Sequence, residues 1–436
     1  MAAIAGGLER KLPGSGLPVS LRRILGRSPL QRHLYHLAEI GVERCVVFLD
    51  GQPAERDVEH EIRRQLAEVP LGGMRVIFVH DDGPGGIPGS VGRPAEVLLV
   101  RSEGVYDPRL YRRILALPSP TWLVDRAREG EGAGEDAVRP IGLAKLDGGS
   151  LPDRVAEIRK AHFGAAVGVE ACAADPRLVV RDLPAYVPDL RRHLRPYWCV
   201  LRTAEDRKRA ERMILDAAQK GVLDFPARFL HPAPENLCVR WIASTPVTPN
   251  QLTVFTGLVA FAATYLFATQ SFGWGLAIAL IVNVLDGVDG KLARVKLQAS
   301  PFGDRLDHLL DVTFELSWYV GLGWGLLQAT GHRLPLQLGV GLVGVMLGAR
   351  AVSGFYKRLT DRQIHDHRPF DRAFRLVAGR RNIYMLVLLV GLAAGHLEEA
   401  FYVTFGWGVA TLLVYMARTL GALATRSRSL LSSLRP

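Results

Sequence analysis

The sequence predicts two bodies of different chemistry, an α/β domain in the first half of the chain and an all-α, six-helix transmembrane domain in the second. Before about residue 240, short apolar runs alternate with helical patterns, and no run approaches the roughly 18 residues that suggest a membrane span. Beyond that point, no charged residue occurs between Arg240 and Asp286, which leaves room for two helices of about 20 residues each.

The first half contains the expected strands and helices in alternation. Strand-like runs rich in β-branched residues lie at 45–49, 74–79 and 97–100. Helical patterns occupy 29–40 and 56–68, and a charged helix begins after Thr203, which is a suitable N-cap. This alternation predicts an α/β domain around a mostly parallel sheet.

Six apolar segments in the second half are candidate spans, at 250–269, 273–285, 308–330, 334–356, 382–396 and 399–420. An even number places both chain ends on one side of the membrane. Basic residues gather after the second and fourth segments and in the tail, and the alternate connections hold few. This bias predicts that both termini lie in the cytoplasm, in a multi-pass protein of the inner (plasma) membrane.

Charge and cysteine content agree with that location. The net charge is +11, but the basic residues of the second half lie at the ends of apolar segments, so we expect membrane lipids and no nucleic acid as partners. The four cysteines, Cys45, Cys172, Cys199 and Cys238, have no metal-ligand spacing and are expected to be reduced thiols. Residues 1–13 lack the apolar stretch of a secretory signal peptide.

Four aspartates carry the candidate chemistry. Asp286 and Asp289 are three residues apart, and Asp307 and Asp311 four apart, so each pair faces one side of a helix. Carboxylates beside apolar spans are costly and are expected to be compensated by cations. Their hard oxygen ligands suit Mg²⁺ or Mn²⁺, and two ions are expected.

Carboxylate-bound metals beside a membrane fit phosphoryl transfer from a nucleotide diphosphate linked to an alcohol, because they bind the diphosphate and neutralise charge on the leaving oxygen. Gly290, Ala293 and Gly303 lack bulk at helical spacings from the aspartates, which lets a nucleotide approach the backbone. Arg294 can form paired hydrogen bonds with a phosphate, and a topogenic role is its alternative.

The aspartate string resembles the signature of the CDP-alcohol phosphotransferase family, D-x2-D-G-x2-A-R-x8-G-x3-D-x3-D, at every fixed position. The resemblance covers roughly residues 235–425 and implies a six-helix membrane fold with CMP as the leaving group. It also implies metal ligation by the four aspartates, a base role for Asp311, and cytidine binding around Gly290, Ala293 and Gly303. The segment from Asn250 to Thr253 is similar to the family's entry sequence, so both residues are expected at the CDP site, with helix capping as their alternative.

The basic connection between residues 357 and 381 could bind a phosphate on the acceptor, as Arg and Lys do in family members that use inositol phosphate. Lys357, Arg380 and Arg381 lie nearest the spans and are the candidate acceptor contacts. Attraction to anionic lipid headgroups is the alternative.

The first half is similar to the nucleotidyltransferase part of fused enzymes that join an inositol-phosphate cytidylyltransferase to a di-inositol-phosphate phosphate synthase. The similar stretches are 24–30, 41–47, 97–107 and 198–224. Residues 5–13 lack the usual small-residue turn, Leu17 replaces an expected lysine, and Ser102 and Glu103 stand where an aspartate is expected. We therefore expect a nucleotidyltransferase-like (Rossmann-like) but degenerate cytosolic domain at 1–230, followed by the transferase domain at 235–425 and a basic cytosolic tail at 426–436.

The leading hypothesis is a membrane CDP-alcohol phosphotransferase whose partners are a CDP-alcohol donor and an alcohol acceptor such as inositol phosphate or glycerol phosphate, with a homodimer considered. One alternative is a bifunctional enzyme whose first half also makes the CDP-alcohol from CTP. Another is an ion-coupled transporter with a cytosolic regulatory domain, because intramembrane carboxylates also mark ion pathways. The paired broken spans of such transporters are not visible in the sequence.

Overall fold

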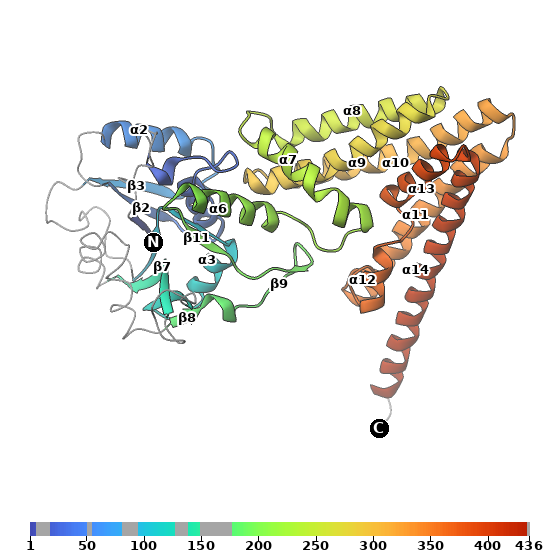
Figure 1. The fold of residues 1–436 in the computed structure, drawn as a ribbon. Coiled ribbons are helices and arrows are strands. Elements are labelled where there is room, and N and C mark those ends of the chain that lie inside the picture. Colours follow the sequence, from blue (N-terminus) through green and yellow to red (C-terminus); the bar gives the residue numbers. More distant parts are fainter. Residues whose placement is uncertain (6–17, 50–54, 81–94, 127–137, 149–176, 434–436) are drawn as a thin grey trace. The chain divides into compact units, whose positions relative to one another are not determined.

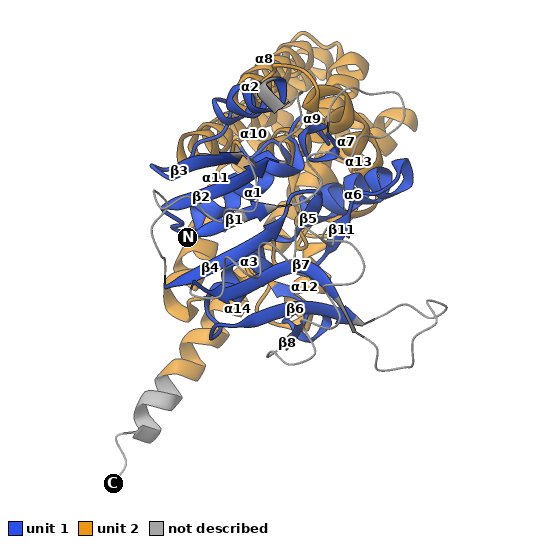
Figure 2. Ribbon diagram, turned by 90° about the vertical axis from the view of Figure 1, so that its left-hand side faces the viewer, with its two compact units in different colours: residues 1–186, 193–218, 295–297 blue, residues 187–192, 219–294, 298–436 orange. Residues whose placement is uncertain are grey.

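The computed structural model describes residues 1–5, 18–49, 55–80, 95–126, 138–148 and 177–433. Two compact units emerge, which Figure 2 colours separately. Unit 1 comprises residues 1–186, 193–218 and 295–297, and unit 2 comprises residues 187–192, 219–294 and 298–436. The α/β character expected of the first half and the helical character expected of the second are both present (Figure 1).

Unit 1 is built on a seven-stranded sheet in the order β3-β2-β1-β4-β7-β6-β8. Its strands are β1 (Ala2–Ala5), β2 (Arg44–Leu49), β3 (Arg75–His80), β4 (Glu96–Arg101), β6 (Thr121–Arg126), β7 (Val138–Asp147) and β8 (Arg177–Val179). The β3-β2-β1-β4 portion and the β6-β8 pair are parallel, and β7 runs antiparallel to both of its neighbours. A second, two-stranded sheet pairs β5 (Gly104–Tyr106) with β11 (Trp198–Val200).

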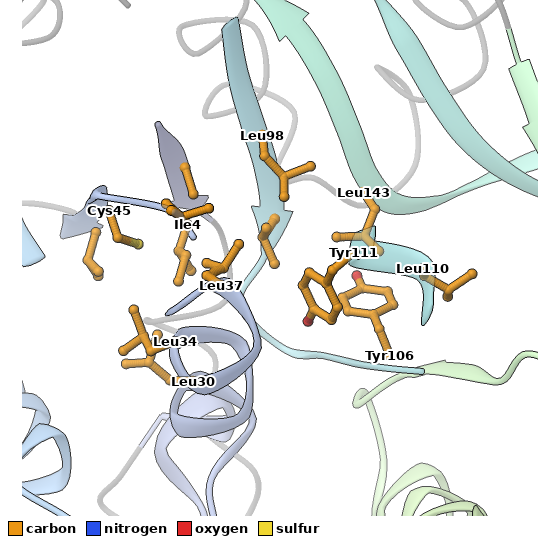
Figure 3. Close-up of a cluster of buried hydrophobic side chains, with 14 of the residues drawn as sticks. Ile4, Leu30, Leu34, Leu37, Cys45, Leu98, Tyr106, Leu110, Tyr111 and Leu143 are labelled. Atoms are coloured by element: carbon orange, nitrogen blue, oxygen red, sulfur yellow. The ribbon is translucent and has the colours of Figure 1, made fainter. Parts of the chain in front are cut away.

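Helix α1 (Pro29–Glu39) covers this sheet with a leucine face. Ser28 caps it in a capping box with Gln31, which fixes its start. Leu30, Leu34 and Leu37 recur at helical spacing and pack with strand residues in one buried cluster (Figure 3). Within the described residues, the remaining α-helices of the unit are α2 (Glu55–Leu66), α3 (Pro108–Leu115) and α6 (Ala204–Ala217). Thr203 caps α6, as the sequence predicts.

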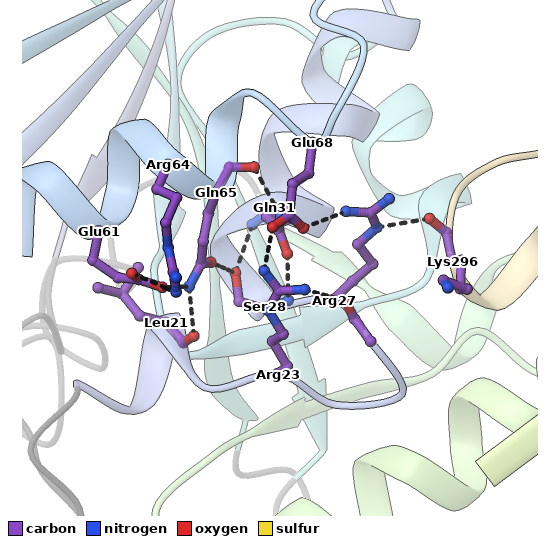
Figure 4. A network of polar contacts seen from close by, with 11 residues as sticks. Leu21, Arg23, Arg27, Ser28, Gln31, Glu61, Arg64, Gln65, Glu68 and Lys296 are labelled. Carbon is purple, nitrogen blue, oxygen red and sulfur yellow. Dashed lines mark hydrogen bonds and ion pairs between the residues drawn. The ribbon is translucent and has the colours of Figure 1, made fainter. Parts of the chain in front are cut away.

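Polar contacts join α1 to α2 at the edge of unit 1 (Figure 4). Gln65 donates to the carbonyl of Leu21 and accepts from the hydroxyl of Ser28, at 2.9 and 2.6 Å. The Arg27 guanidinium pairs with Glu68 at 2.9 Å and donates from Nε to the Lys296 carbonyl oxygen at 2.8 Å. These contacts tie the segment 295–297 to unit 1.

Unit 2 is helical. Its helices are α7 (Pro232–Ala243), α8 (Pro249–Ala268), α9 (Phe272–Val295), α10 (Pro301–Thr330), α11 (Leu334–Thr360), α12 (Pro369–Arg375), α13 (Arg381–Ala393) and α14 (Leu397–Ser433). Helix α10 packs against α8 and α11, and α14 packs against α11 and α13. Aromatic residues of α8 and α10, including Phe267, Phe314 and Trp318, lie in the core of the bundle.

Within the described chain, three helices are long and apolar enough to cross a membrane: α8, α11 and the 397–426 portion of α14. Helix α13 is a shorter apolar helix. Each of the six predicted apolar segments falls largely on a helix. Helices α9 and α10 continue beyond the predicted spans, to Val295 and back to Pro301, whereas α13 ends at Ala393, before the predicted end at residue 396. Six membrane crossings therefore stay a prediction.

Candidate active site

Three carboxylates meet between α9 and α10. One oxygen each of Asp286, Asp307 and Asp311 lies within 4.8 Å of the other two. Asp307 and Asp311 reach the same point because they are one helical turn apart on α10. Such a set of hard oxygen donors fits Mg²⁺ or Mn²⁺ in its chemistry and spacing.

Arg381, the first residue of α13, bridges two of these carboxylates. Its guanidinium lies 2.9 Å from Asp286 Oδ2 and 2.8 Å from Asp311 Oδ1. The same group lies over the Phe314 ring, with 5.6 Å between Cζ and the ring centroid. A buried guanidinium is thus already part of the charge compensation that these carboxylates need. Arg381 is a predicted acceptor contact, and the structure places it against the aspartates.

Asp289 has a different environment from the other three aspartates. It is 4% exposed, accepts a hydrogen bond from Thr253 Oγ1 at 2.7 Å, and accepts another from the Gly290 amide at 2.5 Å. It nevertheless lines one small cavity together with Asp286, Asp307, Asp311 and Arg381. All four aspartates therefore border the same cavity, with Asp289 fixed to α8 through Thr253.

Two predicted nucleotide contacts, Asn250 and Gly303, touch at the start of α8 and α10. A Cβ on Gly303 would lie 2.7 Å from Asn250 Oδ1, so only glycine permits this approach. Gly303 also donates its amide to Ser300 Oγ, the N-cap of α10, at 3.0 Å. At Gly290, a Cβ would meet the Arg294 guanidinium at 3.5 Å, an ordinary contact. Ala293 is half-buried beside this pair on α9.

A second, larger cavity of about 440 Å³ adjoins the aspartates. Asp311 lines both cavities. The polar residues around the larger one come from α10, α11, α13, α14 and the segment between α11 and α13, which includes α12. They are His308, Asp311, Glu315, Tyr319, Arg350, Ser353, His365, Arg375, Arg380, Tyr384, Thr411 and Tyr415.

Arg375, at the end of α12, is the most unusual of these residues. It is 8% exposed, and neither Nε nor Nη1 has a hydrogen-bond partner within the described residues. A buried guanidinium without partners is costly, so its donors are available for an anion in the cavity. His365 adds no further positive charge here, because burial, followed by the charges of Arg380 and Arg191, lowers its pKa to about 3.

Glu315 lines the same cavity one helical turn beyond Asp311. Its carboxylate accepts from the Tyr319 hydroxyl at 3.0 Å and pairs with Arg350 at 2.9 Å. The cavity therefore combines unpaired arginine donors with a carboxylate and several hydroxyl groups.

Of the three predicted acceptor contacts, only Arg380 is among the residues that line the larger cavity. Arg381 pairs with the aspartates, and Lys357 is exposed near the end of α11. Sequence reasoning selected arginines by their distance from apolar segments, and so it missed Arg350, Arg375 and Glu315. The four-residue step from Asp311 to Glu315 on α10 was the available signal for Glu315.

These features define a membrane-associated transferase site with carboxylates suited to divalent cations and an adjoining cavity for a polar anion. Residues 246–414 match the family model described as CDP-alcohol phosphatidyltransferase. Those residues form a domain similar to this family, whose description is that of a transferase. This confirms the class that the aspartate spacing predicts.

Relatives extend the similarity beyond this domain. A protein named "Bifunctional IPC transferase and DIPP synthase" from Aquifex aeolicus is 23% identical over 409 residues, covering 89% of this chain and 90% of that protein. A protein of the same name from Thermococcus kodakarensis is 31% identical over 204 residues, 45% of each chain. Phosphatidylinositol phosphate synthase from Mycobacterium tuberculosis with CDP-DAG bound has a TM-score of 0.35 at 15% identity, covering 41% of this chain and 90% of its own.

Proposed function

We propose that the enzyme transfers a phosphate-linked group from a CDP-alcohol to a phosphorylated polyol and releases CMP. The observation that carries this proposal is Arg375, a buried arginine with unpartnered donors in a 440 Å³ cavity that shares Asp311 with the aspartate cavity. A phosphate on the acceptor would supply the anion that these donors lack.

In this proposal, Asp286, Asp289, Asp307 and Asp311 hold Mg²⁺ or Mn²⁺, with two ions expected. When bound, such ions neutralise the diphosphate of the donor and the charge on its leaving oxygen. Asn250, Thr253, Gly290, Ala293, Arg294 and Gly303 border the CDP moiety. The close approach of Asn250, at the start of α8, to Gly303, at the start of α10, supports this assignment.

Asp311 is positioned to act as the base, because it borders both cavities. It takes the proton from the acceptor hydroxyl while that oxygen bonds to the phosphorus that carries the donor alcohol. The bond between this phosphorus and the CMP oxygen breaks, and its electron pair leaves with CMP. The ion pair from Arg381 fixes the Asp311 carboxylate during this step.

The polar groups around the larger cavity indicate the acceptor's class. Arg375 and Arg380 suit a phosphate, and Glu315 and the neighbouring hydroxyl groups suit the hydroxyls of a polyol. The resemblance of the first half to fused inositol-phosphate enzymes makes an inositol phosphate the first acceptor to test.

The test is CMP release by purified protein with Mg²⁺ or Mn²⁺ and either CDP-diacylglycerol or CDP-inositol. Inositol phosphate and glycerol phosphate would be compared with free inositol and glycerol as acceptors. We expect the phosphorylated acceptors to be strongly preferred and the Asp311→Asn variant to be inactive. Equal use of phosphorylated and free polyols would refute the acceptor assignment, and full activity of Asp311→Asn would refute the catalytic one.

For the first half, we infer a nucleotidyltransferase-like module that binds nucleotide or regulates the transferase. Glu103, which stands where an aspartate is expected, is 3% exposed and pairs with Arg101 Nε at 2.9 Å. The departures from the nucleotidyltransferase pattern at Leu17 and Ser102 support a binding role. Pyrophosphate release from CTP and inositol phosphate would overturn this inference in favour of a bifunctional enzyme.

We further propose that the spans place both termini and the aspartates on the cytoplasmic side of the membrane. The basic connections described above support this orientation. Access of membrane-impermeant reagents to cysteines introduced at the C-terminus, in right-side-out and inverted vesicles, would test it.

A further inference from the structure

A buried ion pair lies on the side of α9 that faces away from the aspartate cavity. Glu235, in the first turn of α7, lies 2.7 Å from the ammonium of Lys291, and both side chains are less than 5% exposed. Lys291 also donates to Asn236 Oδ1 at 2.9 Å. Two consecutive residues of α7 therefore hold one lysine of α9.

Helical geometry links the position of Lys291 on α9 to the position of the aspartates on the same helix. Gly287 and Lys291 are four residues apart and share the face of α9 that contacts α7. Asp289 is about 200° around the helix from Lys291 and bonds instead to Thr253 of α8. Any rotation of α9 that moves Lys291 away from Glu235 would therefore move Asp289 away from Thr253.

Gly287 fixes the distance between the two helices. A Cβ at this position would lie 2.2 Å from Glu235 Oε1 and 2.6 Å from its Cδ. The carboxylate of Glu235 thus rests against the backbone of α9 next to Asp286, at a position that the family signature leaves free. Glycine is needed here because a larger residue would displace either the carboxylate or the helix.

The connection before α7 holds the third helix of the site in a similar way. Asp224 is buried and accepts from the Asn382 side-chain amide at 2.9 Å, next to Arg381 on α13. The Phe225 amide donates to the Leu376 carbonyl at 2.8 Å. The segment 224–243 therefore contacts both helices whose residues, Asp286 and Arg381, form the ion pair in the aspartate cavity.

We propose that Glu235 is a positioning residue for the metal site. Through its contacts with Lys291 and Gly287 it sets the rotation of α9 about its axis and the position of α9 relative to α7, and these determine where the carboxylates of Asp286 and Asp289 lie. The proposal rests on the proposed function, because it takes the aspartates as metal ligands. Groups that orient metal ligands without binding the ion commonly change metal affinity by about 10- to 100-fold when they are mutated. Loss of this contact should therefore weaken Mn²⁺ binding.

The experiment measures Mn²⁺ binding to the full chain in detergent by electron paramagnetic resonance, alongside CMP release as a function of Mn²⁺ concentration. Gly287→Ala would be compared with Gly273→Ala, a matched control on the same helix where a Cβ meets nothing within 4 Å. We expect Gly287→Ala to weaken Mn²⁺ binding about tenfold. Gly273→Ala should bind as the wild type does.

Two further variants separate positioning from folding. Glu235→Gln keeps the shape of the side chain and removes its charge, and it should also raise the Mn²⁺ concentration needed for half-maximal activity. Glu235→Asp combined with Gly287→Ala withdraws the carboxylate from the new methyl group and should recover part of the lost affinity. A merely structural role would lower the active fraction without changing Mn²⁺ affinity in the folded protein.

The outcomes are distinguishable. If the wild type neither binds Mn²⁺ nor releases CMP in a metal-dependent way, the proposed function itself fails. If the wild type does both, and Gly287→Ala and Glu235→Gln bind Mn²⁺ with unchanged affinity, the positioning role is overturned. Should Gly287→Ala fail to fold, Glu235→Gln and the double variant decide the question.

Discussion

Arg381 contributes two ion pairs to the centre of the site, one to Asp286 and one to Asp311. A planar guanidinium can span two carboxylates on different helices, whereas a lysine ammonium is a single point of charge. The residue that opens α13 thus holds α9 and α10 in a common arrangement.

We predict that Arg381→Lys lowers kcat/KM for CMP release about 100-fold while the protein remains folded, because a small displacement of reacting groups is enough for such a loss. Steady-state kinetics would measure it. Arg333→Lys, at the exposed N-cap of α11, is the control and should leave the rate unchanged. Equal rates for Arg381→Lys and the wild type would show that one ion pair suffices.

We predict that replacing Arg375 weakens the binding of a phosphorylated acceptor and leaves the binding of the donor unchanged. Arg375→Gln should raise KM for a phosphorylated acceptor by about 10- to 100-fold, because a charge-assisted hydrogen bond contributes about 1.5–3 kcal/mol. It should leave KM for the CDP-alcohol unchanged. Arg372→Gln, in the same short helix but paired with Asp366 at 2.9 Å, is the matched control. A parallel rise in both KM values would argue against an acceptor contact.

Individual residues also show what sequence spacing can and cannot predict. The intervals between Asp286, Asp289, Asp307 and Asp311 depend on helical geometry alone, and all four border one cavity. The bond from Asp289 to Thr253, and the ion pairs of Arg381, join residues 36 to 95 positions apart. No local pattern encodes such pairings, because they depend on how the helices pack.

Among the elements, α1 carries a buried histidine, His33, and a half-buried one, His36, and both have lowered pKa values. His33 Nδ1 lies 2.6 Å from the Tyr111 hydroxyl, and burial is the main cause that lowers the pKa of His33 from 6.5 to about 4. Burial, then the charges of Arg32 and His33, lowers the pKa of His36 to about 3. Both side chains are therefore neutral in folded unit 1 at neutral pH.

This predicts acid sensitivity for unit 1. Below pH 6.5 the unfolded chain binds protons that the folded unit does not, so the free energy of unfolding falls as the pH drops from about 6.5 toward 4. At pH 5, His33 alone should cost on the order of 2 kcal/mol. Protection factors of β1 and β4 amides in hydrogen exchange, corrected for intrinsic rates, would measure the loss.

The controls for this prediction are histidine variants. His33→Gln should reduce the pH dependence between pH 7 and 5 and leave the part that His36 contributes, because glutamine does not titrate there. His60→Gln, at an exposed position of α2, should leave it unchanged. Protection factors in the wild type that do not change with pH would contradict the proposed cause.

The sequence predicted the boundaries of helices and strands where short runs of neighbouring residues determine them. The predicted runs at 45–49, 74–79 and 97–100 lie within one residue of β2, β3 and β4. Hydropathy underestimated α9 and α10, because it detects apolar side chains whereas backbone hydrogen bonds continue through the aspartates. Strands β6, β7 and β8 had no separate prediction, since their pairing within the sheet is set by distant partners.

At the scale of the whole molecule, the aspartate cavity predicts a strict dependence on divalent cations. Dialysis against EDTA should abolish CMP release, and Mg²⁺ or Mn²⁺ should restore it, because four carboxylates at one cavity need cationic compensation. The measurement is CMP release before and after metal is returned. Full activity in EDTA would mean that Arg381 alone provides enough positive charge.

The shared wall between the two cavities has a consequence for side reactions. As the proposed base, Asp311 would activate whatever hydroxyl stands next to it in the larger cavity, including that of a water molecule. An acceptor that fills this space and satisfies Arg375 excludes water at the moment when the carboxylate is active. An acceptor that fills the cavity would then protect the CDP-alcohol donor from hydrolysis, whereas a poorly fitting alcohol would allow water to hydrolyse the donor.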